Sequence, residues 1–486
     1  MTDTSGADVR SSRFERQMSP AEALMWNVEK DPWLNPSGAS LSLIDGELDG
    51  EVFERWLRSA VAALPRLRER IIPGIGRYER PSWRADREFD FGYHFRHIRL
   101  AGGGTERDLL DFVALAMQEP YDRTRPLWQV TLIGGVEGGR SALLMKLHHS
   151  IADGYGMARM QERFMVRDQD APVPDAVDLD ALVAETCAAE REIDGPSAAD
   201  RALDVASAPP KLARRLLARA ALATADPSVW IDSAQSAQSY AKMIASQVST
   251  DDAGGDGESG NSTAGSPLWT GRSRHRHLEI LRVPLAETRR VGKALGASVN
   301  DIFMTGLVEG AVAHHEARGL PATAFNTSFV VSTRSDSSEG GNSFTPVRVQ
   351  IPAGSMSPVE RVRAVQDHVH RQRTSVTGGG LMGSVAGIVN LLPTSLTTST
   401  ARAQAAKIDF ATTNVRSTSK QLYIAGHEMT EVFAPGPVAG TAMIVAVVSY
   451  LETMHVMLTV DPVAIPESAA LRDDIQAAYS ELFASA

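Results

Sequence analysis

The chain has 486 residues, of which 43% are hydrophobic and 22% are charged, and its formal net charge is −10. This composition is that of a globular protein with enough residues for two domains and sizeable cores. The negative charge disfavours nucleic acid as a partner, because nucleic-acid binding needs a basic surface.

Ordered structure is predicted to begin near residue 18. Residues 1–17 are polar and lack the apolar core of a signal peptide, so we expect a disordered N-terminus there. Ser19, Pro20 and Glu22 then stand at the cap, first and third positions of a predicted helix. No run in the sequence reaches the ~18 uninterrupted apolar residues that a membrane-spanning helix needs.

The first half of the chain, residues 18–170, is predicted to be a mixed α/β domain. Apolar spacing over residues 49–71 predicts an amphipathic helix, with strand candidates on either side at residues 39–46 and 91–100. The segments "LWQVTLIGG" and "SALLMKLHHS" are predicted to pair as a hairpin around "VEGGR".

The second strand of this hairpin runs into the motif "HHSIADG". Because side chains alternate across a pleat, His149 shares a face with leucine and methionine, whereas His148 shares a face with Lys146. If the leucine face points inward, His149 is the histidine carried into the interior and His148 stays on the wetter side. Asp153 is predicted to be the N-cap of a following helix that starts at Gly154.

This motif predicts general-base chemistry. A histidine on an apolar face without a neighbouring nucleophile most naturally takes a proton from the substrate's own hydroxyl, so no covalent enzyme intermediate is needed. Asp153 is expected to brace the turn, since an N-cap carboxylate is occupied by backbone N–H groups. The alternative is a turn without chemistry; the combination of His148, His149, Asp153 and a glycine at a strand-to-helix junction favours a site.

Residues 171–270 are predicted to be a helical and disordered linker region. Cys187 is the only cysteine, and we interpret it as a packing residue in a reducing cytosol. In the segment 211–222, "KLARRLLARAAL", leucines lie beside four cations, a pattern compatible with docking on anionic lipid. A solvated linker helix packed on the protein is the competing interpretation.

From residue 271 to 486 the α/β pattern resumes and predicts a second, largely antiparallel sheet. Strand candidates are "TSFVVST", "QLYIAGHEMTEVFA", "AMIVAVVSYL" and "TMHVMLTVD". Ser298 and Asp301 have the spacing of a capping box, which leaves Asn300 in the first helical turn with its amide available to a developing oxyanion.

Other chemistries find little support in the sequence. Neither a G-x-S-x-G nucleophile elbow nor an H-E-x-x-H zinc motif occurs. The pairs His314/His315 and His368/His370 fall in helical runs and are interpreted as surface positions, so no metal site is predicted.

Together these segments resemble the bacterial wax ester synthase/diacylglycerol acyltransferase family, which is related to chloramphenicol acetyltransferase and to nonribosomal-peptide condensation domains. The shared motif is H-H-x-x-x-D-G. The segments more specific to the family are "MSPAEALMW", Pro126, Leu127 and Trp128 in "RPLWQVTLI", Asn300 and Asp301 in "SVNDIF", and Arg334 and Asn342 in "VVSTR" and "GNSF".

The resemblance implies two acetyltransferase-like α/β domains, residues 18–170 and 271–486, that meet at an active-site tunnel. It implies transfer of a fatty acyl group from acyl-CoA to diacylglycerol or a long-chain alcohol, with His149 as base and no cofactor besides the acyl-CoA substrate. His148 would support the base, Asp153 would hold the loop and Asn300 would lie close to the reacting carbonyl. A cytoplasmic enzyme associated with a membrane or lipid-droplet surface is expected.

The sequence departs from the family pattern near Asn414, where relatives usually carry Asn-x-Pro-Gly-Pro and this chain reads "NVRSTSK". The departure bears on the acceptor side of the site. Two alternatives stay open: a condensation-domain-like acyltransferase that uses a carrier-protein thioester, and a catalytically retired scaffold that binds lipid.

Overall fold

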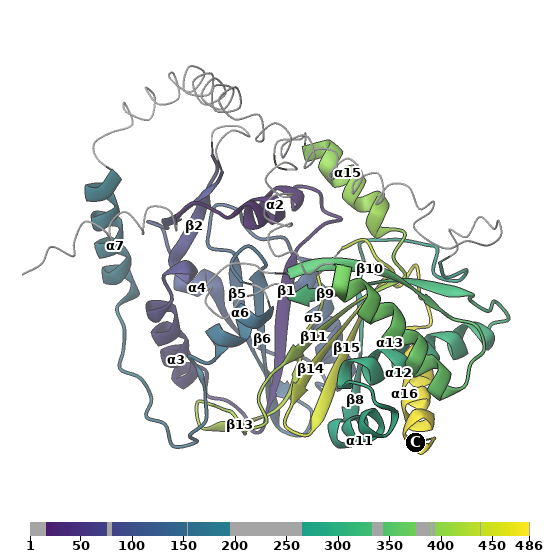
Figure 1. Cartoon of the computed structure of the whole chain (residues 1–486). Coiled ribbons are helices and arrows are strands. Elements are labelled where there is room, and N and C mark those ends of the chain that lie inside the picture. Colours follow the sequence, from purple (N-terminus) through teal and green to yellow (C-terminus); the bar gives the residue numbers. More distant parts are fainter. Residues whose placement is uncertain are drawn as a thin grey trace, which may run out of the picture.

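The computed structural model describes residues 16–74, 80–152, 154–194, 265–332, 344–375, 390, 394–437 and 439–485. These residues form two large β-sheets that lie beside each other and are flanked by helices (Figure 1). Several predictions concern residues outside the described ranges, namely the N-terminal residues 1–15, Asp153, the segment 211–222, Arg334 and Asn342.

The first sheet has seven strands in the order β4-β5-β6-β1-β13-β12-β7. Their bounds are β1 Ser37–Ile44, β4 Phe95–Arg99, β5 Trp128–Val136, β6 Arg140–His148, β7 Met165–Val166, β12 Tyr423–Ile424 and β13 His427–Phe433. Only β4 and β5 are parallel; the other neighbours in this sheet are antiparallel. Two strands from the C-terminal half therefore complete a sheet that is built mainly from the N-terminal half.

The second sheet has six strands in the order β10-β9-β11-β14-β15-β8. Their bounds are β8 His277–Pro284, β9 Ala324–Ser332, β10 Phe344–Pro352, β11 Phe410–Arg416, β14 Met443–Tyr450 and β15 Thr453–Val460. Strand β11 is parallel to β9 and β14, and the remaining pairs are antiparallel. The predicted fold class, mixed α/β with largely antiparallel sheets, is confirmed. A separate hairpin pairs β2 Glu69–Ile72 with β3 Ser82–Ala85.

Several of the described helices begin at a capping side chain. Ser19, Asp49, Thr105 and Ser298 each accept a hydrogen bond from a backbone N–H in the first turn. The helices are α2 Pro20–Val28, α3 Gly50–Ala63, α4 Phe91–His94, α5 Glu106–Gln118, α6 Gly154–Gln161, α7 Leu179–Asp194, α11 Leu285–Leu295, α12 Val299–Glu316, α13 Pro358–Ser375, α15 Thr394–Ala405 and α16 Ser468–Ala484, with a 3-10 turn at Pro65–Arg68. Among the described residues, no helix has the length and apolar character to span a bilayer.

Strand β6 is covered on both faces. Leu143, Met145 and Leu147 belong to an apolar cluster that also contains Phe53 and Trp56 of α3. The opposite face packs on α5, and Lys146 on that face is only 2% exposed, with Nζ donating to the carbonyl of Ala116 near the end of α5. The prediction that this face is the wetter one is wrong, because a helix covers it and the lysine is satisfied by the helix's own C-terminal carbonyls.

Other predictions are confirmed or corrected by the same packing. The amphipathic helix of residues 49–71 ends earlier than expected, because Pro65 begins a 3-10 turn after α3. His314 and His315 are 2% and 0% exposed, so their assignment to the surface is wrong: α12 is a central helix covered by α16. Cys187 is buried in α7, in agreement with a packing role.

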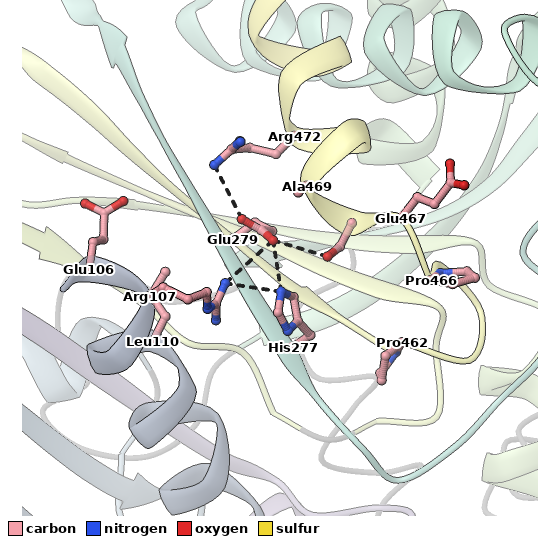
Figure 2. Close-up of a pocket in the computed structure, with 11 residues that line it drawn as sticks. Glu106, Arg107, Leu110, His277, Glu279, Pro462, Pro466, Glu467, Ala469 and Arg472 are labelled. Carbon is pink, nitrogen blue, oxygen red and sulfur yellow. Dashed lines mark hydrogen bonds and ion pairs between the residues drawn. The ribbon is translucent and has the colours of Figure 1, made fainter. Parts of the chain in front are cut away.

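The two halves are joined by ion pairs as well as by strands. Glu279 on β8 accepts from Nε2 of His277 at 2.9 Å and from Oγ of Ser468 at 3.2 Å. Its carboxylate also lies 3.6 Å from guanidinium nitrogens of Arg107 on α5 and Arg472 on α16 (Figure 2). We call these five residues the Glu279 cluster. It lines a cavity of about 460 Å³ between α5 and α16, and none of the predicted site residues lines that cavity.

Candidate active site

His149 directly follows β6, and its backbone N–H donates to the carbonyl of Pro36 at 3.0 Å. Its ring nitrogen Nδ1 lies 3.3 Å from the carbonyl oxygen of Ala152. Because a carbonyl oxygen can only accept, this contact places a proton on Nδ1, and in the neutral ring the lone pair is then on Nε2. The ring is half-buried. His149 therefore has the tautomer that a general base acting through Nε2 requires.

The ring of His149 lies against the backbone of β1. A Cβ atom at Gly38 would lie 3.2 Å from Nε2 of His149 and 3.8 Å from Cε of Met157 on α6. The missing side chain at Gly38 thus makes room for the imidazole between β1 and α6. Gly38 is not among the predicted site residues; its position next to an apolar strand run was the signal that could have identified it.

His148 has a different environment. Its side chain is 0% exposed, its Nδ1 accepts the N–H of Ser150 at 3.0 Å, and Nε2 lies 3.5 Å from Oε2 of Glu29. Burial, with smaller contributions from His149 and Arg123, holds the pKa of His148 well below its usual value. His148 is therefore a neutral, buried imidazole with its proton on Nε2, and its supporting role stays a prediction.

Pro126, Leu127 and Trp128 support the strand that carries the histidines. All three are buried, and the carbonyl of Leu127 accepts the N–H of His148 at 3.0 Å. The Trp128 indole donates to the carbonyl of Leu67 at 2.7 Å and stacks on His94, with ring centroids 4.5 Å apart. The Leu127 bond joins the start of β5 to the end of β6, and the Trp128 contacts join β5 to the 3-10 turn and to α4.

Asn300 and Asn414 form a second group. The predicted capping box is present: Ser298 accepts from the N–H of Asp301, whose carboxylate accepts the N–H of Ser298 at 2.8 Å. Asp301 is 2% exposed and is thereby a structural residue. Asn300, one position before it, accepts at Oδ1 from Nδ2 of Asn414 on β11, at 3.1 Å.

The described hydrogen bonds thus connect the predicted residues in two groups. One contains His148 and Leu127, and the other contains Asn300 and Asn414; His149 is the chain neighbour of His148 and bonds to Pro36 and Ala152. Gly154 starts α6 as predicted, whereas the expected capping by Asp153 lies outside the described residues. Groups of three or more side chains suited to a metal ion do not occur in the described part of the chain.

Solved structures with the same architecture come from two kinds of protein. The wax ester synthase/diacylglycerol acyltransferase from Marinobacter aquaeolei VT8 superposes with a TM-score of 0.62 at 18% identity, covering 96% of this chain and 98% of that one. The first condensation domain of the calcium-dependent antibiotic synthetase superposes with a TM-score of 0.57 at 18% identity, covering 96% of each chain. The fold is therefore the one that condensation domains and this acyltransferase share.

Sequence comparison separates these two classes. The chain matches the wax ester synthase/diacylglycerol acyltransferase catalytic domain over residues 18–303 and the C-terminal domain of that family over residues 340–483. It is 27% identical to a putative diacylglycerol O-acyltransferase of Mycobacterium tuberculosis H37Rv, over 98% of this chain and 93% of the relative. A probable diacylglycerol O-acyltransferase of that strain, Tgs4, is also 27% identical over 81% of each chain. The chain belongs to the wax ester synthase/diacylglycerol acyltransferase family, and it is an acyltransferase, as the resemblance implied.

Proposed function

We propose that the protein transfers a fatty acyl group from acyl-CoA to the hydroxyl of diacylglycerol, and in the same manner to a long-chain alcohol. Nε2 of His149 takes the hydroxyl proton while the oxygen attacks the thioester carbonyl. An ester C–O bond forms, the C–S bond breaks, and the proton passes from His149 to the leaving sulfur of CoA. No covalent enzyme intermediate is needed. The observation that carries this assignment is the Nδ1 contact with Ala152, which leaves Nε2 unprotonated.

Asn300 is the proposed donor to the developing oxyanion. With its Oδ1 occupied by Asn414, the Nδ2 group of Asn300 is the side that remains for a substrate oxygen. No metal or other cofactor takes part in this proposal.

Diacylglycerol is the preferred acceptor in this proposal because both mycobacterial relatives are named as diacylglycerol O-acyltransferases. The second candidate is a reaction in which a carrier-protein thioester is the acyl donor. The fold shared with a condensation domain is the observation that favours it. The acyl-CoA reaction has more support, since the family match extends over both halves of the chain.

Incubation of the purified protein with radiolabelled palmitoyl-CoA and either dioleoylglycerol or hexadecanol tests the proposal. Labelled triacylglycerol is the expected product, with wax ester formed from hexadecanol, and thin-layer chromatography separates the two. His149→Ala serves as the matched control for non-enzymatic transfer. Absence of both products with the wild-type protein, together with transfer from a palmitoylated carrier protein, would establish the second candidate instead.

We further propose that the protein works in the cytoplasm at a membrane or lipid-droplet surface, since both acceptors partition into lipid. The cations of "KLARRLLARAAL" support this, because each cation near an anionic bilayer contributes about 1 kcal/mol. Flotation with anionic liposomes is expected to recover the wild-type protein at low salt and less of a variant with Arg214, Arg215 and Arg219 changed to glutamate. Equal recovery of both would exclude this segment as the docking element.

A further inference from the structure

A buried ion pair lies behind the histidine motif. Glu29 caps the C-terminal end of α2, and its side chain is only 6% exposed. Its Oε2 lies 2.8 Å from a guanidinium nitrogen of Arg123. A second guanidinium nitrogen donates to the carbonyl of Trp26 at 2.8 Å, and the guanidinium carbon Cζ lies 3.3 Å from the centroid of the Trp26 ring. Arg123 therefore holds the Glu29 carboxylate in one place.

This carboxylate faces the histidine next to the proposed base. Nε2 of His148 lies 3.5 Å from Oε2 of Glu29, slightly beyond hydrogen-bond distance. Within the described part of the chain, Nε2 of His148 and Oε1 of Glu29 are both buried without a hydrogen-bond partner. The oxygen that faces Nε2 of His148 is Oε2 of Glu29, which also accepts from Arg123. If this distance shortens by a few tenths of an ångström, the buried Nε2 donor gains an acceptor and the contact gains free energy.

The proton of His148 is on the side that faces Glu29. Because the N–H of Ser150 donates to Nδ1, the neutral ring carries its proton on Nε2. The ring of Tyr121 lies edge-on to His148, and Lys146 lies over the Tyr121 ring. The charged and titratable groups around the Glu29 carboxylate are thus Arg123, Lys146, Tyr121 and His148.

We propose that Glu29, held by Arg123, is a positioning residue that accepts the Nε2 proton of His148 and thereby fixes the turn that presents His149 to the acceptor hydroxyl. The inference rests on the proposed function, with His149 as base. Glu29 does not touch substrate. It acts through His148, whose Nδ1 accepts the N–H of Ser150 and whose carbonyl accepts the N–H of Ile151, so that His148 holds the turn after His149. It also supplies a negative charge that favours a protonated His149 during transfer, while Arg123 supplies the opposing charge.

Opposite single-charge changes test this role. In Glu29→Gln the Arg123 charge is left uncompensated, so the apparent pKa of the acidic limb of the kcat/KM profile is expected to fall by about 0.5–1 unit. In Arg123→Gln the limb is expected to rise by a similar amount. The double variant removes both charges and is expected to return the limb toward the wild-type position. A purely structural role would lower activity in all three without shifts of opposite sign.

Glu22→Gln is the matched control. It makes the same chemical change on the same helix, and glutamine preserves the capping box with Ser19. Its pH profile, kcat and KM are expected to equal those of the wild type. In Glu29→Gln, by contrast, kcat is expected to fall about tenfold or more while KM for palmitoyl-CoA stays unchanged, because positioning affects the chemical step.

A readout that does not need activity separates this inference from the proposed function. ¹⁵N-histidine spectra of the wild-type protein are expected to show His148 as a neutral ring protonated on Nε2, and Glu29→Gln is expected to shift that Nε2 resonance. Glu29 has no positioning role if Glu29→Gln and Arg123→Gln both leave two quantities unchanged: the apparent pKa of the acidic limb of the kcat/KM profile, and the Nε2 resonance of His148. If the resonance shifts but the protein transfers no acyl group, the contact between Glu29 and His148 is supported and only the proposed reaction is refuted.

Discussion

The side-chain amide of Asn414 donates to Oδ1 of Asn300 across 3.1 Å and joins the end of β11 to the first turn of α12. The bond determines which side of the Asn300 amide faces outward. The divergent segment "NVRSTSK" keeps only the first residue of the Asn-x-Pro-Gly-Pro pattern, Asn414. Its bond to Asn300 gives a physical reason for an asparagine at this position.

Loss of this bond is expected to reduce transfer through Asn300. If Nδ2 of Asn300 binds the oxyanion, Asn300→Ala costs about 10²–10³-fold in kcat. Asn414→Ala leaves the donor in place but free to rotate, so a smaller loss of about tenfold is expected. The double variant should be no slower than Asn300→Ala. Additive losses in steady-state kinetics would show that the two residues act independently.

Replacement of His149 and replacement of His148 are expected to have different effects on turnover and stability. His149→Ala should lower kcat by about 10²–10⁴-fold with an unchanged melting temperature, because it removes a half-buried base. His148→Ala should also lower the free energy of unfolding by about 1–3 kcal/mol, because the Ser150 N–H loses a buried acceptor. Thermal unfolding measured beside turnover distinguishes them. Near-normal turnover of His149→Ala would assign the base to His148.

Gly38→Ala is expected to lower kcat by displacing the ring of His149, since the added methyl would lie 3.2 Å from Nε2. Gly134→Ala on β5 of the same sheet is the control, because its methyl would meet neighbouring atoms only at 3.7 Å or more. We expect at least tenfold loss of kcat for the first and little change for the second. Equal kcat for both would mean that the ring has room to move without loss of alignment.

The Glu279 cluster is expected to stabilise the contact between the two halves in a pH-dependent manner. Burial alone would raise the pKa of Glu279, but the hydrogen bond from His277 and the charges of His277, Arg107 and Arg472 outweigh it and lower the pKa below 4.5. Its contribution is therefore fully present above pH 4.5 and is lost as the pH falls through the lower pKa of the folded protein.

Glu279→Gln should accordingly lower the free energy of unfolding by about 1–3 kcal/mol at pH 7, and by less in acid. Glu467→Gln, in the wall of the same cavity but with a side chain 64% exposed, should change it by no more than about 0.5 kcal/mol. Urea unfolding at pH 7 and pH 4 measures both. A difference between Glu279→Gln and the wild type that grows in acid would contradict the assigned sign.

Local patterns predicted much of this fold from the sequence. The capping boxes at Ser19 and Ser298 and the hairpin of β5 and β6 depend on neighbours in the chain, and all of them are present. The environment of His148 was predicted wrongly, because alternation identifies the two faces of a strand but not whether a helix covers both. Placing α5 over Lys146 requires tertiary packing.

The same distinction applies to the site. The capping pattern placed Asn300 in a first helical turn, which depends on local geometry and is present. Alternation predicted His149 as the histidine carried into the interior, but the ring of His149 is half-buried and His148 is the fully buried one. Glu29 lies more than a hundred residues before His148 in the sequence, and the two side chains face each other only in the folded chain. Gly38 likewise becomes informative only once β1 lies beside the end of β6.

The pairing of β1 with β13 has a consequence for the order in which the chain can fold during synthesis. Leu41 leaves the ribosome early, yet its partner Phe433 is almost four hundred residues away, so one edge of β1 stays without its neighbour until nearly the whole chain has been made. An unpaired strand edge invites intermolecular pairing. Expression of residues 16–194 alone would therefore leave an open edge beside β1, whereas supplying residues 420–437 in trans would close it.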